Sequence, residues 1–267
     1  MNDINFAVTV VKATGSTNDD LEALAKSDII SKDSLLNFHG YTEIAFSQTA
    51  GRGRFDREWD SGHGGLYQST LLFMEALPGI DFSKLTIITA LAACGAIEKL
   101  LPEGILRIKW PNDITAGGKK ICGMLLKAMP GITGTPVIIG IGVNVFNQVD
   151  RSKLRNANIL QPGNLEEFAS RKFGESDIIE LSGAIGAALN GLLKEAAAGG
   201  YERIFSDYNS RLLYKGEKIT LYNRVEEDIV MASGIFCGLD ENGFLKIENA
   251  DTKEIKSYPS GEIRRIQ

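Results

Sequence analysis

The segment that decides the fold reads Val137-Ile138-Ile139-Gly140-Ile141-Gly142-Val143-Asn144-Val145. Its side chains are almost continuously apolar instead of alternating between apolar and polar, which is typical of a strand buried on both faces. We therefore predict that this strand lies in the middle of a sheet. A chain of 267 residues with 43% hydrophobic residues is long enough to build one large core around it.

Strand and helix patterns alternate around this segment up to about residue 215. Strands are expected at 6–11, 43–48, 66–74, 106–110 and 120–127, and helices at 16–26, 82–101 and within 164–199. The pattern then changes to short strands at 217–221, 230–236 and 244–247, separated by turn-forming residues. This predicts an α/β (α+β) chain in which residues 1–212 form a large domain and residues 213–267 a small antiparallel barrel or sheet.

The composition argues against several classes of protein. A net charge of −5 argues against broad electrostatic binding to nucleic acid or anionic lipid, so any basic site must be local. No apolar run is long enough to cross a bilayer and the first residues lack the features of a signal peptide, so we expect a cytoplasmic protein. The three cysteines, Cys94, Cys122 and Cys237, have apolar neighbours, as expected of reduced core thiols.

One local basic site is conspicuous. The stretch Gly51-Arg52-Gly53-Arg54-Phe55-Asp56-Arg57-Glu58-Trp59 carries three arginines and two glycines. Glycine lets the backbone approach a ligand closely, and each guanidinium offers a planar, permanently charged fork to carboxylate or phosphate oxygens. A solvated turn is the ordinary explanation of a basic cluster, but the glycine spacing and the neighbouring Trp59 favour an anion-binding loop.

A second polar group follows in Lys109-Trp110-Pro111-Asn112-Asp113 and Lys120-Ile121-Cys122-Gly123. A turn at 116–118 would join two strands and bring Asn112 and Lys120 to the same end of a hairpin. An amide, a carboxylate and an ammonium group would then converge with the arginine loop on one bound anion. Such a set suits the activation of a carboxylate by ATP, which requires electrostatic stabilisation more than acid–base catalysis.

Other nucleotide and hydrolase motifs are missing from the sequence. There is no Gly-x4-Gly-Lys-Ser/Thr run, and Gly140-Ile141-Gly142 lacks the third glycine of a dinucleotide fingerprint. The two histidines, His39 and His63, do not lie near a nucleophile elbow. An exposed loop position explains His63 about as well as a ligand contact.

Four motifs resemble, in order and spacing, those of the biotin protein ligases. They are Gly51-Arg52-Gly53-Arg54-x-x-Arg57-x-Trp59, Lys109-Trp110-Pro111-Asn112-Asp113, Lys120-Ile121-x-Gly123 and Gly140-x-Gly142-x-Asn144. The resemblance covers nearly the whole chain, including Ser16-Thr17-Asn18 and Ser260-Gly261-Glu262-Ile263. It implies a catalytic domain like the core of class II aminoacyl-tRNA synthetases, with a mixed sheet flanked by helices, and a C-terminal SH3-like barrel.

The resemblance also implies roles for individual residues. The biotin-binding residues would be Ser16, Thr17, Asn18, Gln48, Arg52, Gly53, Arg54 and Lys120. Those that bind ATP or the adenylate would be Arg54, Arg57, Trp59, Asn112 and Asn144. Lys120 and Arg54 would be catalytic, and Asp113 would either hold Mg²⁺ or cap a turn.

The activity implied is a two-step ligation. ATP activates biotin to biotinyl-5′-AMP, and the biotin is then transferred to a lysine of a biotin carboxyl carrier protein of acetyl-CoA carboxylase. The resemblance also implies Mg²⁺ as the partner of ATP and allows a homodimer. Because the chain begins close to its first predicted strand, there is no room for an N-terminal helix-turn-helix, and we expect a ligase that binds neither DNA nor membranes.

Two residues depart from the family pattern. Asp56 stands where glycine is usual before the third arginine, which adds a negative charge to the loop, and Lys127 stands where an acid is more common. Two other functions remain open. One is a lipoate or octanoate transferase, for which Cys122 is the nearest candidate nucleophile, and the other is a non-catalytic sensor of biotin or nucleotide.

Overall fold

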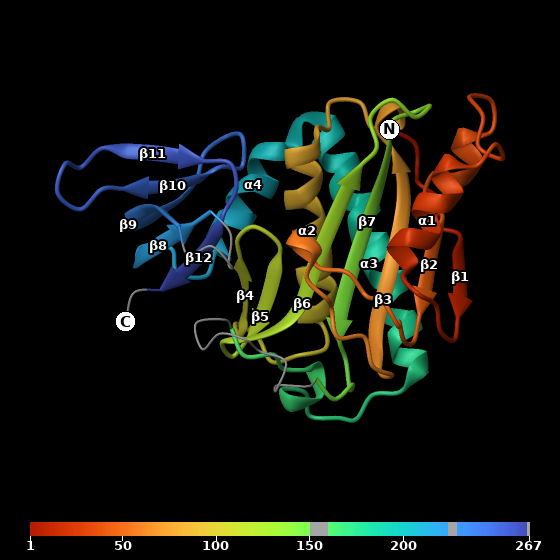
Figure 1. The fold of residues 1–267 in the computed structure, drawn as a ribbon, viewed down its shortest axis with the longest axis horizontal. Helices are drawn as coiled ribbons and strands as arrows, with labels where there is room; N and C mark the ends of the chain where they lie inside the picture. Colours follow the sequence, from red (N-terminus) through yellow and green to blue (C-terminus); the bar gives the residue numbers. More distant parts are fainter. Residues whose placement is uncertain (150–159, 224–228, 266–267) are drawn as a thin grey trace.

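The computed structural model describes residues 1–149, 160–223 and 229–265, with the side chain of Asp56 left out, and it contains two sheets (Figure 1). Residues 150–159 of the predicted large domain, and 224–228 and 266–267 of the small one, lie outside this description. The large sheet has seven strands, in the spatial order β1-β2-β3-β7-β6-β5-β4. They are β1 (Val8–Val11), β2 (Thr42–Ala45), β3 (Gly65–Phe73), β4 (Leu106–Lys109), β5 (Asp113–Ala116), β6 (Lys119–Ala128) and β7 (Pro136–Asn144).

The large sheet is mixed, as expected. β1 and β2 run parallel, and every other neighbouring pair runs antiparallel. The apolar segment that predicted a central strand is β7, which lies fourth of seven between β3 and β6. That prediction is confirmed.

The two faces of the large sheet are covered by different helices. Successive side chains of a strand point to opposite faces. Ile138 of β7 packs with Leu21 of α1 (Thr17–Lys26), whereas Ile139 belongs to the core that includes α2 (Phe82–Glu98) and α3 (Glu175–Glu195). Both faces of β7 are therefore buried, which explains its apolar sequence.

A further helix, α4 (Tyr201–Ser210), was not expected from the sequence. The run Ala196-Ala197-Ala198-Gly199-Gly200 predicts a helix end, and Gly199 does leave helical geometry with φ of 91°. The chain then resumes a helix because Ile204 and Tyr208 bury one face of α4 in the core with α2. Only the tertiary contact distinguishes this kink from a true end.

The small sheet has five strands in the order β11-β10-β9-β8-β12, all antiparallel, and among the described residues its edge strands β11 and β12 do not pair with each other. They are β8 (Lys218–Tyr222), β9 (Val230–Leu239), β10 (Leu245–Glu248), β11 (Ile255–Tyr258) and β12 (Glu262–Arg265). The first three match the predicted strands, and the last two were missed. Of the two alternatives, barrel or sheet, the described strands form an open sheet.

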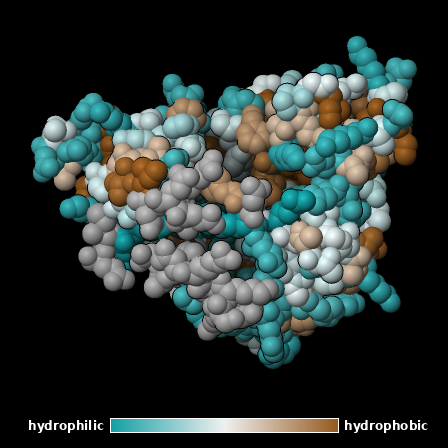
Figure 2. Space-filling view, in the orientation of Figure 1, coloured by the Kyte–Doolittle hydropathy of each residue, from teal (hydrophilic) through white to brown (hydrophobic). Residues whose placement is uncertain are grey.

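One face of the molecule is mostly hydrophilic, with hydrophobic residues in small separate groups (Figure 2). Among the exposed apolar side chains are Val8 and Val10 of the edge strand β1. Within the described ranges, no helix combines the length and the apolar character that crossing a membrane requires.

Candidate active site

The floor of the candidate site, which we call the glycine floor, consists of Gly123, Gly140 and Gly142 of the large sheet. Gly140 and Gly142 are two residues apart on β7 and so share a face, the one covered by α1. Gly142 pairs with Gly123 of β6, and Gly140 pairs with Ser69 of β3. The glycine spacing rejected above as a dinucleotide motif therefore has another role, which is to leave room on this face of the sheet for the side chains of Trp59 and Asn18.

Trp59 lies directly on this floor. A methyl group added at Gly142 would be 2.7 Å from Trp59 Nε1, and one added at Gly123 would be 2.7 Å from Cζ3. The ammonium group of Lys120 lies 5.0 Å from the centre of the same indole, within the range of a cation–π contact. The indole N–H is buried and has no hydrogen-bond partner among the described residues.

A chain of polar side chains lies beside the floor. The backbone N–H of Thr17 donates to Gln48 Oε1 at 2.9 Å, and Gln48 Nε2 donates to Ser61 Oγ at 3.0 Å. The hydroxyl of Thr17 is 2.7 Å from that of Ser69, which donates to Asn18 Oδ1 at 2.7 Å. Ser16, also buried, immediately precedes α1 and so lies next to these groups. Four of the residues expected to bind biotin are therefore close together, namely Ser16, Thr17, Asn18 and Gln48.

The glycine-arginine stretch forms a hairpin, which we call the arginine hairpin and define as residues 51–59. Gly53 N donates to Arg57 O at 2.7 Å and Trp59 N donates to Gly51 O at 2.9 Å. The tip carries Phe55 in the left-handed region, with φ of 57°, a conformation that favours glycine.

Arg54 points from the hairpin toward β5. Its Nη1 donates to Asn112 Oδ1 at 3.2 Å, and Asn112 Nδ2 donates to the carbonyl of Met124 at 2.8 Å. Burial lowers the pKa of the Arg54 guanidinium, while the charges of Glu262 and Asp113 raise it. An arginine in such a place is available to stabilise the charge of an anionic ligand.

Lys120 pairs with Asp113, whose Oδ1 lies 2.7 Å from Nζ. The expected backbone arrangement is wrong, because Lys120 lies opposite Thr115 near the turn, whereas Asn112 precedes β5 at the other end of the hairpin. The convergence arises instead from the long lysine side chain, which lies on the same face as Asp113. A register shift between Ile114 and Thr115 accompanies this arrangement.

The small sheet contributes a carboxylate that the sequence analysis did not assign to the site. Glu262 Oε1 lies 2.6 Å from Lys109 Nζ, and Glu262 Oε2 lies 3.8 Å from Arg57 Nη2. Glu262 was noted only as part of a family ending, and Lys109 only as part of a motif. A sequence signal for their pairing is lacking, because the two residues lie on different sheets.

The remaining expected residues have defined partners. Asn144 is buried, and its Nδ2 donates to the carbonyl of Gly163 at 3.0 Å, so its amide helps to hold the segment beside β6. Arg52 donates from Nε and Nη2 to Asp19 Oδ2 at 2.9 and 2.7 Å. Neither contact assigns a ligand to these residues, so their binding roles stay predictions.

Three other residues singled out from the sequence do not form part of the cluster. Cys122 is fully buried, and burial raises the pKa of its thiol, which does not suit an exposed nucleophile. His63 Nε2 lies 2.9 Å from Glu175 Oε1 on α3. Lys127 Nζ lies 2.5 Å from Glu22 Oε2, which gives its charge a partner on α1.

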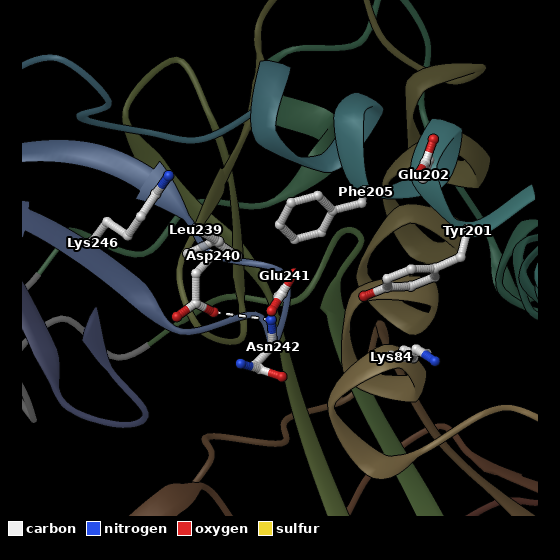
Figure 3. Close-up of a pocket in the computed structure, with 9 residues that line it drawn as sticks. All are labelled: Lys84, Tyr201, Glu202, Phe205, Leu239, Asp240, Glu241, Asn242 and Lys246. Atoms are coloured by element: carbon white, nitrogen blue, oxygen red, sulfur yellow. Dashed lines mark hydrogen bonds between the residues drawn. The ribbon is translucent and has the colours of Figure 1, made fainter. Parts of the chain in front are cut away.

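A separate open cavity of about 470 Å³ lies between the helices and the small sheet (Figure 3). Tyr201 and Phe205 of α4 and Lys84 of α2 line one side, and residues 239–242 and Lys246 line the other. None of the residues expected to bind biotin or ATP lines it. The candidate site is therefore the glycine floor with the arginine hairpin, not this cavity.

Comparison with known proteins shows which family the chain resembles. A profile of the Biotin/lipoate A/B protein ligase family matches residues 27–144, which include the arginine hairpin and the glycine floor. The bifunctional ligase/repressor BirA of Bacillus spizizenii is 39% identical over 115 residues, which cover 42% of this chain and 34% of the relative. The chain thus matches about a third of that relative's length.

Other relatives match over most of their length. A biotin–[acetyl-CoA-carboxylase] ligase of Paracoccus denitrificans is 28% identical over 82% of this chain and 88% of its own length. The structure of a biotin protein ligase from Aquifex aeolicus in complex with biotin and ATP superposes with a TM-score of 0.76 and 26% identity, covering 97% of this chain and 99% of that one. Residues 27–144 therefore match the biotin/lipoate A/B protein ligase family, and the relatives that match the chain over most of its length are biotin protein ligases.

Proposed function

We propose that this protein is a biotin protein ligase, which activates biotin with ATP and transfers it to a lysine of a carrier protein. The observation that carries the proposal is that Lys120 lies over Trp59 on the glycine floor, while Arg54 contacts Asn112 and Thr17 contacts Gln48. The relatives support the same substrates, because they include a ligase named for acetyl-CoA carboxylase and a structure with biotin and ATP.

Biotin would bind on the side of the floor next to α1. Its ureido ring needs paired donors and acceptors, which hydroxyl and amide side chains supply. Ser16, Thr17, Asn18 and Gln48 are of these types and lie together. The apolar valeryl chain would run from these groups toward the arginine hairpin, and its carboxylate would meet that hairpin, including Arg52 and the backbone of Gly53.

The first half-reaction joins two anions. A carboxylate oxygen of biotin attacks the α-phosphorus of ATP, the bond from that phosphorus to the bridging oxygen of pyrophosphate breaks, and pyrophosphate leaves with the electron pair. Lys120 and Arg54 would offset the mutual repulsion of the two anions and stabilise the charge that develops at phosphorus. Arg57, Trp59, Asn112 and Asn144 would hold the adenylate half.

The second half-reaction consumes the mixed anhydride. The ε-amine of a lysine on a biotin carboxyl carrier domain attacks the biotin carbonyl, an amide bond forms, and AMP leaves. Until then the adenylate must be kept from water, so the arginine hairpin would act as a lid as well as an anion-binding loop.

Magnesium would accompany ATP. Asp113, in the motif 109–113, is the carboxylate that would hold the ion. Among residues 1–149, 160–223 and 229–265, no group of three or more His, Cys, Asp or Glu side chains is placed to hold a metal. This suits Mg²⁺, which keeps several waters and is bound chiefly by substrate phosphates. Asp113 would have to exchange its pairing with Lys120 for the ion.

The two sheets would have different roles in this function. Residues 1–212 would form a catalytic domain like the core of class II aminoacyl-tRNA synthetases, and residues 213–267 a small SH3-like domain. The mixed sheet and the separate five-stranded antiparallel sheet support this assignment.

The test is to add biotin, ATP and Mg²⁺ to the purified protein and to follow pyrophosphate release, then to add a carrier domain and measure its mass. Pyrophosphate release followed by biotinylation of a single lysine is the expected result. Acyl transfer from lipoate or octanoate, without a response to biotin, would instead assign the protein to the transferase branch. Binding of biotin without any product would identify a sensor.

A further inference from the structure

The arginine hairpin is held at both of its legs by carboxylates from distant parts of the chain. On one leg, Arg57 Nη2 lies 3.8 Å from Glu262 Oε2 of the small sheet. On the other, Arg52 donates from Nε and Nη2 to Asp19 Oδ2, at 2.9 and 2.7 Å. Asp19 does not belong to any of the four motifs that resemble those of the biotin protein ligases.

The position of Asp19 links this ion pair to the biotin side of the site. Asp19 lies in the first turn of α1, directly after Ser16, Thr17 and Asn18. The backbone hydrogen bonds across the hairpin make its two legs move together, so a restraint on Arg52 restrains the hairpin as a whole. The ion pair therefore connects the helix that carries the biotin-side polar groups to the loop that would cover them.

We propose that Asp19 is a positioning residue that keeps the arginine hairpin closed and thereby slows the escape of biotinyl-adenylate. Asp19 acts through Arg52 and does not touch the reacting atoms. This inference rests on the proposed ligase function, because it concerns the lid of that same site.

The solvent exposure of the Arg52–Asp19 ion pair determines how much it can slow the release of adenylate and how strongly that contribution depends on salt. The Arg52 side chain is 56% exposed and that of Asp19 is 39% exposed. An exposed ion pair shifts an equilibrium by at most about fivefold. Salt at about 1 M screens exposed charges at distances beyond a few ångströms, so the contribution of Asp19 should depend strongly on ionic strength.

The experiment compares Asp19→Asn with the wild-type protein and with Glu22→Gln. Glu22 is a matched control because it is also an ion-paired acid of α1, but its partners are Lys26 and Lys127 and not the hairpin. At about 0.05 M salt, Asp19→Asn should release preformed biotinyl-adenylate about two- to fivefold faster than the wild type. The rate constant of adenylate formation should change less than about twofold, and Asp19→Glu should restore retention.

The salt dependence of adenylate release distinguishes the loss of this ion pair from a general loss of structure. The difference between Asp19→Asn and the wild type should disappear at about 1 M salt, while Glu22→Gln should match the wild type at both salt concentrations. Equal retention by Asp19→Asn and the wild type at low salt would overturn the proposal. So would faster release that is independent of salt.

Hydrogen exchange of residues 51–59 in the ligand-free protein separates this proposal from the ligase assignment. Asp19→Asn should speed exchange in the hairpin at low salt, with α3 unchanged, whether or not the protein makes adenylate. If the wild type releases no pyrophosphate, the proposed function fails but the exchange result still tests the anchoring role of Asp19. Unchanged exchange in the hairpin would overturn that role.

Discussion

Glu262 of the small sheet accepts a hydrogen bond from Lys109 of the large sheet at 2.6 Å, although the two residues are 153 positions apart. Their side chains are only 14% and 7% exposed. Burial raises the pKa of Glu262, but Lys109, Arg57 and Lys120 outweigh it and hold this pKa below its usual value. The small sheet therefore supplies the counter-charge for a basic cluster of the large one.

Replacing Glu262 by glutamine should destabilise the protein, because it leaves the buried ammonium of Lys109 without its counter-charge. We expect a loss of about 3 kcal/mol near neutral pH. Since the pKa of Glu262 is depressed in the folded state, its contribution is present above the ordinary value of 4.5 and is lost as the pH falls below it. Urea unfolding of the wild type and Glu262→Gln at about pH 7 and about pH 3.5 measures the loss of stability and its dependence on pH.

Glu217→Gln is the control for this change, because Glu217, just before β8, pairs with Arg265 of β12 but is 41% exposed. It should cost less than about 0.5 kcal/mol. A loss in Glu262→Gln that stays the same at both pH values would show that the charge of Glu262 is not what stabilises the contact.

Replacing Lys120 by alanine should slow adenylate formation by about a hundredfold or more, because the proposed site would lose the cation that faces its two substrate anions. Single-turnover pyrophosphate release measures this rate. Lys119→Ala is the matched control, since the neighbouring Lys119 pairs with Glu167 outside the cluster. Normal turnover by Lys120→Ala would refute the role assigned to Lys120.

Replacing Arg54 by alanine should let adenylate escape, because the arginine hairpin loses its hydrogen bond to Asn112. A filter assay of retained biotinyl-adenylate tests this expectation, with a loss of about tenfold as the anticipated scale for a charged hydrogen bond. Arg107→Ala, which removes contacts to the carbonyls of Gly104 and Leu106, should retain the intermediate as the wild type does. Unchanged retention in Arg54→Ala would contradict the lid.

Replacing Gly142 by alanine should displace Trp59, because the new methyl group would lie 2.7 Å from Nε1 and 2.8 Å from Cε2 of the indole. We expect a shift in tryptophan fluorescence and weaker nucleotide binding. Gly183→Ala is the control, because a methyl group there meets no atom within 4 Å and lies in a helix, where alanine is favoured by about 1 kcal/mol. Identical fluorescence in Gly142→Ala and the wild type would contradict the stacking.

Replacing Glu43 by glutamine should stabilise the protein at alkaline pH. Burial, together with a hydrogen bond and charge repulsion from Asp20, raises the pKa of Glu43 to about 7. The folded state therefore holds a proton that the unfolded state has lost, so the wild type loses stability as the pH rises from about 4.5 through about 7. Glutamine should remove this loss.

The expected gain from Glu43→Gln is about 1 kcal/mol at pH 8.5 and near zero at about pH 4, a figure reduced for the partial exposure of the carboxyl group. Thermal unfolding across this range checks it. A stability difference that grows toward acidic pH would have the wrong sign for the proposed proton binding.

Several elements followed from the sequence because their cause is local. The apolar run of β7 predicted its central position. The spacing of glycine and arginine predicted a loop, which the structure shows as a hairpin, while its binding of an anion stays a prediction. Hydrophobic periodicity and turn residues report the secondary structure of the segment that carries them. Local sequence gave a wrong prediction at α4. The pair Gly199-Gly200 predicts the end of a helix, but in the structure it marks a kink after which α4 begins.

Other features depended on the complete fold. The ion pair of Glu262 with Lys109, the contact of Asp19 with Arg52 and the packing of Trp59 on Gly142 each join segments that are far apart in the chain. A sequence determines which residues are charged, aromatic or small, and where short strands and helices form. Which of those side chains meet was decided only by the tertiary structure, because sheet order, strand register and helix packing set the distances between them.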